Sequence, residues 1–526
     1  MLRWFRPRPW LGLAAILSLT AAYATLVQGP GWNQNSHYAL TRALADQRVP
    51  WIDVSRYRIG QEVTYDISVY KGHVYSNKAP GFAFATLPAY IVMKAAGQAS
   101  PPTDDSRQLW LLGLWSVVLP ALVLLLVVRR VANDLEPGFG TAAAVTLGIG
   151  TLMLPFATLF FSHILSALLG FAAFAVLWYE RRRQASLGMV AAAGLLVGYA
   201  VTTEFPNAIM AAILGLAALA RPPRVRRAAA FGAGALVGLA PLLAYQQWAF
   251  GSPFRVPYSY TVGFGSTGSL FLTTPSFRRL IEVLFAPVGI LRTTPVLAVA
   301  AVGIVLLFRR GCRFEARVIA GITVAFLLFE ASYATPFGGG SPGPRQMVPM
   351  LPFLALPLAT AFRRMPLTTI ALAAVSLVEM VASTITHPIF YTADYANWFR
   401  RLGAHDFSAT VLTFFSNHHF IDGLMDRATT GWLPLLAFGV PAVLAIAFTL
   451  AERPPVTLRL RDALQAGLCL AGWALLNREG PKLLYSGHSL GREWAPEVVL
   501  FIAAGVVVVA SALPYALTSG AARSPS

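Results

Sequence analysis

The chain has 526 residues, of which 56% are hydrophobic and only 12% are charged. A soluble chain carries about twice that charged fraction, so the composition excludes an ordinary soluble domain and indicates a polytopic membrane protein. The net charge of +18 would suit a nucleic-acid-binding protein, but the arginines stand in short clusters at the ends of apolar runs. Such clusters hold helix ends on the cytoplasmic side of a membrane, so no nucleic-acid partner is expected.

Apolar segments recur along the whole chain. A transmembrane helix needs about 20 apolar residues, and about fourteen segments come close to this length. We therefore predict an all-α polytopic membrane protein. The segments are 10–27, 109–128, 139–157, 160–180, 187–203, 205–220, 228–250, 283–308, 317–335, 347–362, 366–386, 431–450, 464–477 and 497–517.

The arginine clusters orient these segments. They lie at 129–130, 181–183, 221–227, 309–317 and 363–364. If the apolar run 82–96 also crossed the membrane, every cluster would face outside, against the preference of arginine for the cytoplasm. We therefore predict that 82–96 is an interfacial or re-entrant helix. The long segments that then become extracytoplasmic are 28–108, 251–282, 387–430 and 478–496.

Several catalytic signatures are absent from the sequence. It contains no GxxxxGK[ST] phosphate loop and no CxxC or HExxH motif, so ATP-driven transport and zinc chemistry gain no support. The predicted cytoplasmic loops are also too short for a nucleotide-binding domain. The residues that can do chemistry lie almost entirely in the extracytoplasmic segments.

The first external segment begins with a predicted helix and contains a predicted hairpin. Asn35 or Ser36 is expected to cap a helix with one apolar face, as an interfacial helix needs. The later stretch "TYDISVYKGHVYSNKAPG" at 64–81 alternates apolar and polar residues and then turns at "KG". This pattern predicts a short strand and a turn before the run 82–96.

Asp53 and Asp66 are the leading acids of this segment. A carboxylate near the membrane surface could act as general base toward a hydroxyl acceptor. The alternative is that either aspartate caps a turn or pairs with a nearby cation, of which Arg56, Arg58 and Lys71 are the candidates.

Lys78 stands just before the run 82–96, where its ammonium could reach a lipid phosphate or lie among the headgroups. Three polar residues precede it, His73, Tyr75 and Ser76. They could contact a sugar or phosphate, or they could brace the turn.

Three more polar residues stand at the expected outer ends of spans. His163 opens an apolar run and could be satisfied locally. Glu204 lies between two apolar runs, where a carboxylate is a functional candidate, with a hairpin tip in water as the alternative. Arg345 follows the loop "FGGGSPGP". Glycines there allow a close approach of the backbone, and a guanidinium can bind phosphate through two parallel bonds, although it could simply anchor the helix end.

Five blocks carry a resemblance to a known family. They are "GHVYSNKAPG", "FFSHILSALL", "TTEFP", "FGSPF" and "GGGSPGPRQMVPMLPFLALPL". Together with the order of one span, a long polar loop, an amphipathic run and many spans, they resemble the GT-C superfamily of membrane glycosyltransferases. The similarity is to the bacterial branch related to protein O-mannosyltransferases and lipid A aminoarabinose transferase, and it covers about the first 365 residues.

The resemblance implies an inverting sugar transfer from a polyprenyl-phosphate donor to an acceptor on the extracytoplasmic face of a bacterial cytoplasmic membrane. Lys78 and Arg345 match the positions of the family's phosphate-binding cations, and Asp66 or Asp53 would be the base. One departure stands out, because the acid that relatives have just after the first span is replaced here by "NQNSHY". The base has moved, the acceptor differs, or the transfer activity is lost.

The resemblance also predicts the overall organisation. Residues 1–365 would form the catalytic module, and 366–526 would add C-terminal helices with the loops 387–430 and 478–496. The substrate-binding residues would be the cations Lys78 and Arg345 together with five residues that line the sugar-phosphate pocket. These five are His73, Tyr75, Ser76, His163 and Glu204. No cofactor or metal is implied, with a divalent ion on external carboxylates as an alternative. A flippase for lipid-linked glycans and a non-catalytic envelope-assembly subunit are the rival functions.

Overall fold

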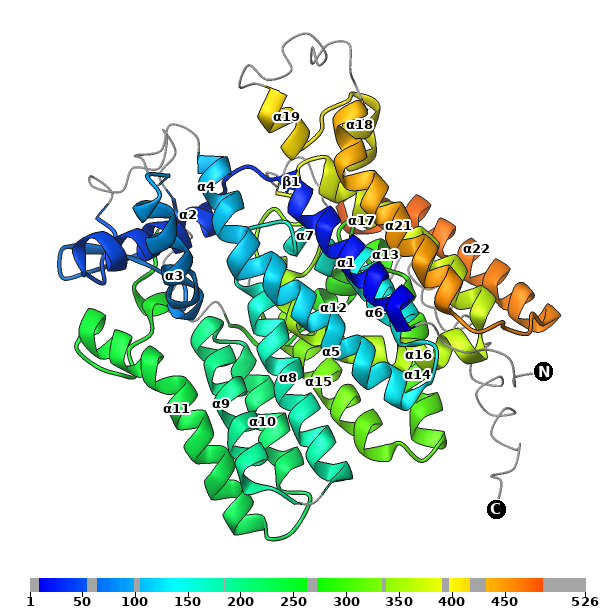
Figure 1. The fold of residues 1–526 in the computed structure, drawn as a ribbon, viewed down its shortest axis with the longest axis horizontal. Helices are drawn as coiled ribbons and strands as arrows, with labels where there is room; N and C mark the ends of the chain where they lie inside the picture. Colours follow the sequence, from blue (N-terminus) through cyan, green and yellow to red (C-terminus); the bar gives the residue numbers. More distant parts are fainter. Residues whose placement is uncertain are drawn as a thin grey trace.

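The structure is a computed structural model that describes residues 9–53, 64–98, 105–183, 185–262, 272–333, 337–389, 397–416 and 432–485. Helices dominate this part of the chain, as Figure 1 shows, and its strands form two short antiparallel pairs. The predicted all-α class is therefore confirmed.

The elements of the first half are α1 Pro9–Thr25, β1 Leu26–Val27, α2 Trp32–Arg42, the π-helical turn η1 Ala43–Gln47, β2 Ile67–Tyr70, β3 His73–Ser76, α3 Gly81–Ala95, α4 Asp105–Gly113, η2 Leu114–Val118, α5 Leu119–Leu135, α6 Gly140–Ile149, α7 Met153–Phe156, α8 His163–Arg182, α9 Leu187–Thr203, α10 Asn207–Ala218, α11 Arg224–Phe250 and η3 Pro257–Tyr260. The second half contains α12 Phe277–Phe285, α13 Ile290–Thr293, α14 Val296–Arg309, α15 Arg313–Ser332, η4 Arg345–Met350, α16 Leu351–Arg364, α17 Pro366–Ile385, α18 Trp398–Gly403, β4 Ala409–Thr410, α19 Val411–Ser416, η6 Leu433–Leu435, α21 Leu436–Glu452 and α22 Leu460–Tyr485.

The five arginine clusters lie together at one end of the helix bundle, which we call the arginine end. Carboxylates at the ends of α5, α8 and α15 join one cluster to another. The pairs are Arg310–Glu136, Arg363–Glu136, Arg227–Glu180 and Arg182–Glu315. This common location agrees with the single cytoplasmic face that the sequence predicts for the clusters.

The chain crosses the bundle twice before the first cluster. Arg129 of α5 donates to the carbonyl oxygen of Pro9 at the start of α1 (3.1 Å), and Trp110 of α4 donates to that of Ala24 near the end of α1 (2.8 Å). Helix α1 and the continuous helix α4–η2–α5 therefore run antiparallel. Helix α3 begins with Gly81 beside the far end of α9, and Lys94 in its last turn pairs with Asp46 of η1 (2.8 Å), so the helix ends against the first loop segment. The interfacial or re-entrant helix at 82–96 stays a prediction.

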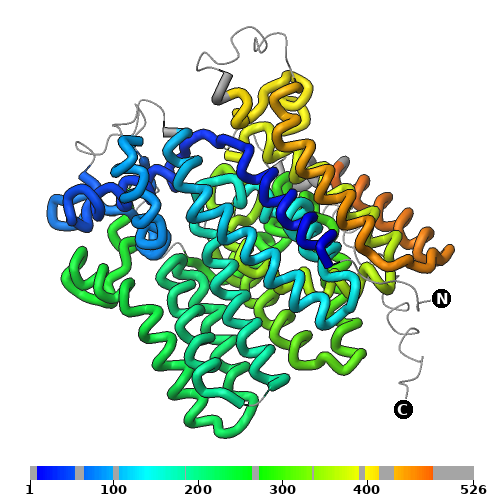
Figure 2. The backbone as a smooth tube through the Cα atoms, in the orientation of Figure 1, coloured from blue at the N-terminus to red at the C-terminus, as the bar shows by residue number. Residues whose placement is uncertain are grey.

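Segments from three of the predicted external loops meet at the opposite end. Strand β1, which lies directly before segment 28–108, pairs with β4 of segment 387–430, and Ser408 of that segment donates to Gln28 (2.9 Å). Ser68 of β2 donates to the carbonyl oxygen of Pro257 (2.7 Å), which adds segment 251–282. Figure 2 shows the blue and yellow parts of the tube side by side there.

In the described part of the chain, five helices are long and apolar enough to cross a membrane, or six if one bent pair is included. They are Ser106–Leu135, His163–Arg182, Arg224–Phe250, Pro366–Ile385 and Leu433–Glu452. Helices α1, α3, α6, α9 and α10 are apolar but shorter. The count of about fourteen spans is thus not confirmed and stays a prediction; its last segment, 497–517, lies outside the described residues.

The predicted span 283–308 is broken. Helix α12 ends at Phe285, and α14 begins at Val296 after the short α13, with a bend of 88° between the two halves. Pro287 and Pro295 stand at the two breaks. Proline has no backbone N–H for the bond to the preceding turn, so a straight helix cannot continue through either position.

Helices α9 and α11 pack backbone to backbone through glycines. Gly194 and Gly198 of α9 lie against the α11 backbone, and Gly234 and Gly238 of α11 lie against that of α9. A Cβ on Gly198 would come within 2.3 Å of the carbonyl oxygen of Ala235. The four-residue spacing in both helices is that of small-residue packing between membrane helices.

Helix α2 differs from its prediction. It begins at Trp32, after Gly31, and not at Asn35 or Ser36, and all residues from 33 to 41 are buried. Helix α3, the hairpin and α4 surround it. It is therefore a buried polar helix and not, as predicted, an amphipathic helix with a single apolar face.

Candidate active site

A β-hairpin places Lys78 beside Asp66. Strands β2 and β3 pair with Ile67 opposite Ser76, and the turn 71–72 has positive φ at both residues, as tight hairpin turns require. Asp66 precedes β2 and Lys78 follows β3, so strand pairing brings both to the same end of the hairpin. Lys78 Nζ lies 3.1 Å from Asp66 Oδ2.

Ser76 holds this end of the hairpin against α2. Its hydroxyl is 2.7 Å from that of Ser36, which also contacts the backbone oxygen of Asp66 at 2.7 Å. The backbone N–H of Lys78 donates to Ser76 Oγ (3.2 Å). Ser76 thus positions the backbone of Lys78.

Burial weakens the hold of Lys78 on its proton. Its side chain is only 10% exposed, and this burial lowers the pKa of the ammonium, with Arg345 acting in the same direction and Asp66 opposing it. A buried ammonium has given up its hydration, so a phosphate group offered to Lys78 would meet a poorly solvated cation.

His163 and Glu204 form a second buried pair. Helix α8 begins at His163 and α9 ends just before Glu204, so both residues lie at the end of the bundle opposite the arginine clusters. His163 Nδ1 is 2.5 Å from Glu204 Oε1, and Ser162 donates to the same oxygen at 2.5 Å. Ser166 adds a longer contact to Glu204 Oε2 at 3.4 Å.

Arg345 begins η4 directly after the glycine-rich loop. Gly338 of this loop has a φ of +65°, and a Cβ there would lie 2.5 Å from Arg345 Nε, so glycine leaves the space for the guanidinium. The guanidinium lies 5.7 Å from the ring centre of Phe161, a cation–π distance. Among the described residues, its buried Nε has no hydrogen-bond partner.

Five of the predicted site residues come together. The charge of Arg345 acts on Lys78 and on Glu204, and Lys78 and Glu204 act on each other. Since Asp66 pairs with Lys78 and His163 pairs with Glu204, all five belong to one group, which we call the charged cluster. It joins elements from 66 to 345 in the sequence and carries two cations that could face an anion.

Three predicted site residues make their contacts outside the charged cluster, namely Asp53, His73 and Tyr75. Asp53 accepts from the backbone N–H of Val74 (3.1 Å) and is 3.2 Å from His73 Nδ1, whose ring stacks on Trp51. Tyr75 packs on an aromatic ring of α11, and burial followed by Asp53 raises the pKa of its hydroxyl. Alternate residues of a strand face opposite sides, which is why Tyr75 and Ser76 diverge.

His37, on α2, is a member of this region that the sequence analysis did not single out. Its side chain is 1% exposed, and its ring meets that of Phe82 edge-on at 5.0 Å. Lys78, His163 and Arg345 all act on it electrostatically. No sequence signal marked it as buried, because its neighbours in "NQNSHY" are polar.

Two further groups border the charged cluster. Glu330, near the end of α15, is fully buried, and neither carboxylate oxygen has a hydrogen-bond partner in the described ranges. Arg345 acts on it and on Tyr258 of η3. In these ranges, no three His, Cys, Asp or Glu side chains are grouped so as to hold a metal ion.

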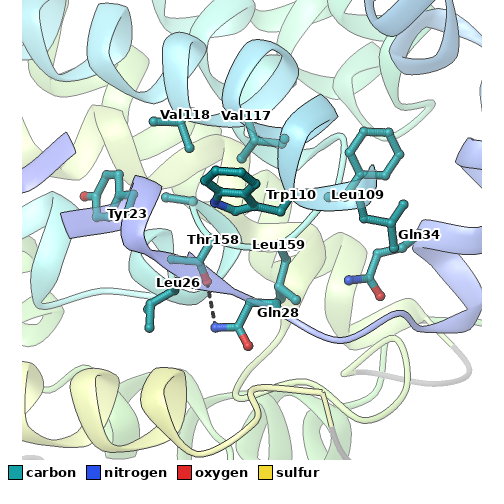
Figure 3. Close-up of a pocket in the computed structure, with 13 residues that line it drawn as sticks. Tyr23, Leu26, Gln28, Gln34, Leu109, Trp110, Val117, Val118, Thr158 and Leu159 are labelled. Carbon is teal, nitrogen blue, oxygen red and sulfur yellow. Dashed lines mark hydrogen bonds between the residues drawn. The ribbon is translucent and has the colours of Figure 1, made fainter. Parts of the chain in front are cut away.

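A narrow pocket lies between α1, α4 and the 157–160 turn, and none of the five residues of the charged cluster lines it. Figure 3 shows Trp110 among its apolar walls, with Gln28 donating to Thr158 (3.2 Å). Gln34 of α2 also lines it. The free volume of about 20 Å³ has room for about one water molecule and no sugar ring.

No family model and no curated protein matches the chain. Among solved structures, it is similar to ArnT from Cupriavidus metallidurans bound to undecaprenyl phosphate, at 15% identity and a TM-score of 0.42, over 97% of this chain and 78% of that one. It is also similar to the Archaeoglobus fulgidus oligosaccharyltransferase in complex with zinc and sulfate. That match has 15% identity and a TM-score of 0.48, over 75% of this chain and 55% of that one.

A third similar structure is the archaeal oligosaccharyltransferase AglB from Archaeoglobus fulgidus with an inhibitory peptide and a dolichol-phosphate, at 14% identity and a TM-score of 0.43, over 94% of this chain and 62% of that one. The chain thus spans less than two thirds of the archaeal proteins. Identities and TM-scores this low do not establish a family, so we argue the function from the geometry of the site.

Proposed function

We propose that the protein transfers a sugar from a polyprenyl-phosphate donor to an acceptor hydroxyl, at the end of the bundle opposite the arginine clusters. The observation that carries the proposal is the charged cluster, in which the buried Lys78 and the half-buried Arg345 lie close enough to interact. Two cations held close together repel each other, and an anion placed between them would relieve that repulsion. A phosphate held by a lipid is such an anion, and the location suits a donor that arrives through the membrane.

The two cations would act on the departing phosphate. The acceptor oxygen bonds to the anomeric carbon, the bond from that carbon to the phosphate oxygen breaks, and the electron pair stays on the polyprenyl phosphate. The negative charge that develops there would be met by the ammonium of Lys78 and the guanidinium of Arg345. Preorganised charges of this kind lower the barrier most when water is excluded, and Lys78 is buried while Arg345 is half-buried. Attack opposite the leaving group gives inversion.

The paired acids would occupy the cationic side chains until the donor binds. In the structure, Asp66 forms an ion pair with Lys78, and Glu204 lies 2.5 Å from His163. An incoming phosphate would compete with Asp66 for the ammonium. Of the two predicted bases, Asp66 is therefore the one near the proposed phosphate site, whereas Asp53 holds His73 and the hairpin backbone.

A flippase and an assembly subunit remain the rival functions. A transporter would place charged groups near the middle of the bundle, but the charged cluster lies at one end. An assembly subunit would bind its partner without moving a sugar, and it predicts no transfer by the isolated protein.

The test is sugar transfer by the purified protein in lipid nanodiscs, with radiolabelled polyprenyl-phosphate sugars and extracted envelope glycans as acceptors. Binding of polyprenyl phosphate is measured in parallel. Lys78→Met and Arg345→Met should each weaken that binding by about tenfold to a hundredfold, because a hydrogen bond to a charged group contributes about 1.5–3 kcal/mol. Transfer should fall at least as much.

Lys71→Met is the matched control. Lys71 is an exposed lysine of the same hairpin, over the ring of Tyr70 and outside the charged cluster. Its replacement should leave binding and transfer unchanged. Equal binding in wild type and both cluster variants would reject the phosphate site, and binding without transfer in wild type would favour the assembly subunit.

A further inference from the structure

The imidazole of His37 is buried without hydrogen bonds. Both ring nitrogens are inaccessible to solvent, and neither has a partner in the residues that the structure describes. Leaving a buried donor or acceptor unmet costs about 1–3 kcal/mol for each group. A polar side chain kept in this state inside a packed helix indicates that a ligand group completes it.

The surroundings keep this ring neutral. Burial, followed by the charges of Lys78, His163 and Arg345, holds the pKa of His37 well below its ordinary value. A neutral imidazole offers one N–H donor and one free lone pair. His37 therefore has a lone pair available for a proton across the physiological pH range.

Two carboxylates of the charged cluster are already engaged. Asp66 is held by Lys78, and Glu204 receives contacts from Ser162, Ser166 and His163. Glu330, on which Arg345 also acts, has no hydrogen-bond partner among the described residues, so its replacement is compared with that of His37 below. Neither ring nitrogen of His37 is occupied by a hydrogen bond in the same residues.

We propose that His37 is the general base, and that it takes the proton of the acceptor hydroxyl while that oxygen bonds to the anomeric carbon. This inference rests on the proposed function. The bond from the anomeric carbon to the phosphate oxygen breaks with its electron pair, so the proton moves to an imidazole nitrogen and the negative charge to the polyprenyl phosphate. Return of that proton to the phosphate resets both groups.

The arrangement also links the base to the donor. The groups that act on His37 include the two that would hold the phosphate, Lys78 and Arg345. A phosphate bound to them would cancel part of their charge and make the imidazole a stronger base. His37 would then become effective only when the donor is in place, which protects the donor from premature reaction.

The experiment compares kcat for sugar transfer with the Kd for polyprenyl phosphate in His37→Gln. Glutamine keeps a donor and an acceptor but cannot take up a proton, so kcat should fall about 100-fold or more, while the Kd stays within about twofold. In His37→Ala, added imidazole should restore part of the transfer. Asp66→Asn and Glu330→Gln, run beside it, should retain more kcat than His37→Gln.

The matched control is His387→Gln, a histidine outside the charged cluster that pairs with Asp406 at 3.2 Å; it should keep its kcat. A kcat within threefold of wild type in His37→Gln would overturn the proposal, with the proposed function intact. So would a loss of transfer that follows a loss of polyprenyl-phosphate binding, because a packing role would move both. If wild type itself transfers no sugar, both proposals fail.

Discussion

At the scale of single residues, Lys78 has the property that is easiest to measure. Its pKa is lowered by burial, and only its protonated form can hold a phosphate. Binding of polyprenyl phosphate should therefore weaken as the pH rises through the lowered pKa, well before an ordinary lysine with a pKa of about 10.4 would deprotonate. Asp66 and Glu204 raise this pKa and Arg345 lowers it, so the limit reflects the whole cluster.

Lys78→Arg separates this group from the others. A guanidinium stays protonated throughout the accessible range, so the variant should lose the alkaline limb of the binding curve even if its affinity is lower. An unchanged limb in Lys78→Arg would show that another group titrates.

A second residue pair should matter for stability and not for binding. Arg227 and Glu180 are 1% and 0% exposed and meet through two bonds of 2.6 and 3.0 Å. Arg227→Met leaves the carboxylate of Glu180 buried without its main partner, which should cost about 3–5 kcal/mol of unfolding free energy. Denaturant unfolding in detergent measures this change.

Arg278→Met is the comparison for that measurement. Arg278 pairs with Glu282 on one exposed helical turn, and its side chain is 53% exposed. Such a pair contributes about 0.3–0.5 kcal/mol. Similar losses in both variants would contradict the assignment of a buried, essential pair at the arginine end.

Individual site residues were predictable to the extent that they broke an apolar pattern. Lys78, Glu204 and Arg345 are polar groups beside long apolar runs, and the structure brings them together. His37 was missed because its neighbours in "NQNSHY" are all polar, so nothing marked it as buried. The neighbours of His37 in space include Phe82 and Lys78. The pairing of β2 with β3, and not the local sequence, brings them close to it.

At the scale of elements, the glycine contact between α9 and α11 is the most exacting. Gly198→Ala would push a methyl group into the backbone of α11, since the new Cβ would lie 2.3 Å from a carbonyl oxygen. Overpacking of this kind should cost about 1–3 kcal/mol. It should also reduce transfer, because α9 leads directly to Glu204.

Gly232→Ala, on α11, is the matched control. No atom outside its own helix lies within 4 Å of a Cβ at that position, and alanine is the better helix former by about 1 kcal/mol. Unfolding should show this variant to be as stable as wild type or slightly more stable. A loss as large as that of Gly198→Ala would mean that the helices do not pack through these glycines.

The elements were predictable where the pattern is local. The strand and "KG" turn of the first loop are confirmed as β2, the turn 71–72 and β3. The break in 283–308 could have been predicted from Pro287 and Pro295, which a count of apolar residues does not consider. The start of α2 at Trp32 could not be foreseen, because Gly31 caps it without a side-chain bond. The repeated spacing in "GLLVG" and "GALVG" is a signal that sequence reading could have used.

At the scale of the whole molecule, the two ends of the bundle should face opposite sides of the membrane. Lys71 in the hairpin turn is exposed, and Val225 beside the arginine clusters is 83% exposed. In a background of Cys312→Ser and Cys469→Ser, a membrane-impermeant maleimide added to intact cells should label Lys71→Cys. It should label Val225→Cys only after lysis.

Labelling of both positions in intact cells would contradict this topology. Labelling of Val225→Cys alone in intact cells would invert it and would place the charged cluster inside.

The arrangement of the arginines was predictable, because it follows from a rule about charge and membranes. The meeting of distant loops was not. Strands β1 and β4 are two residues long, too short for any periodicity, and their pairing depends on helices that fold between them. The residue types of the site could therefore be predicted from the sequence, whereas their arrangement in space depends on the packing of the whole chain.

That assembly has a consequence for biosynthesis. Gln28, four residues before α2, receives a hydrogen bond from Ser408, 380 residues later in the chain. At synthesis rates of about 5–20 residues per second, the two are separated by roughly 20 to 80 s. During that time the segment just before helix α2 lacks its hydrogen bond from Ser408. Nascent chains that stop short of Ser408 would carry most of the apolar helices and an unfinished bundle end opposite the arginine clusters, which is the kind of defect that membrane quality-control proteases detect.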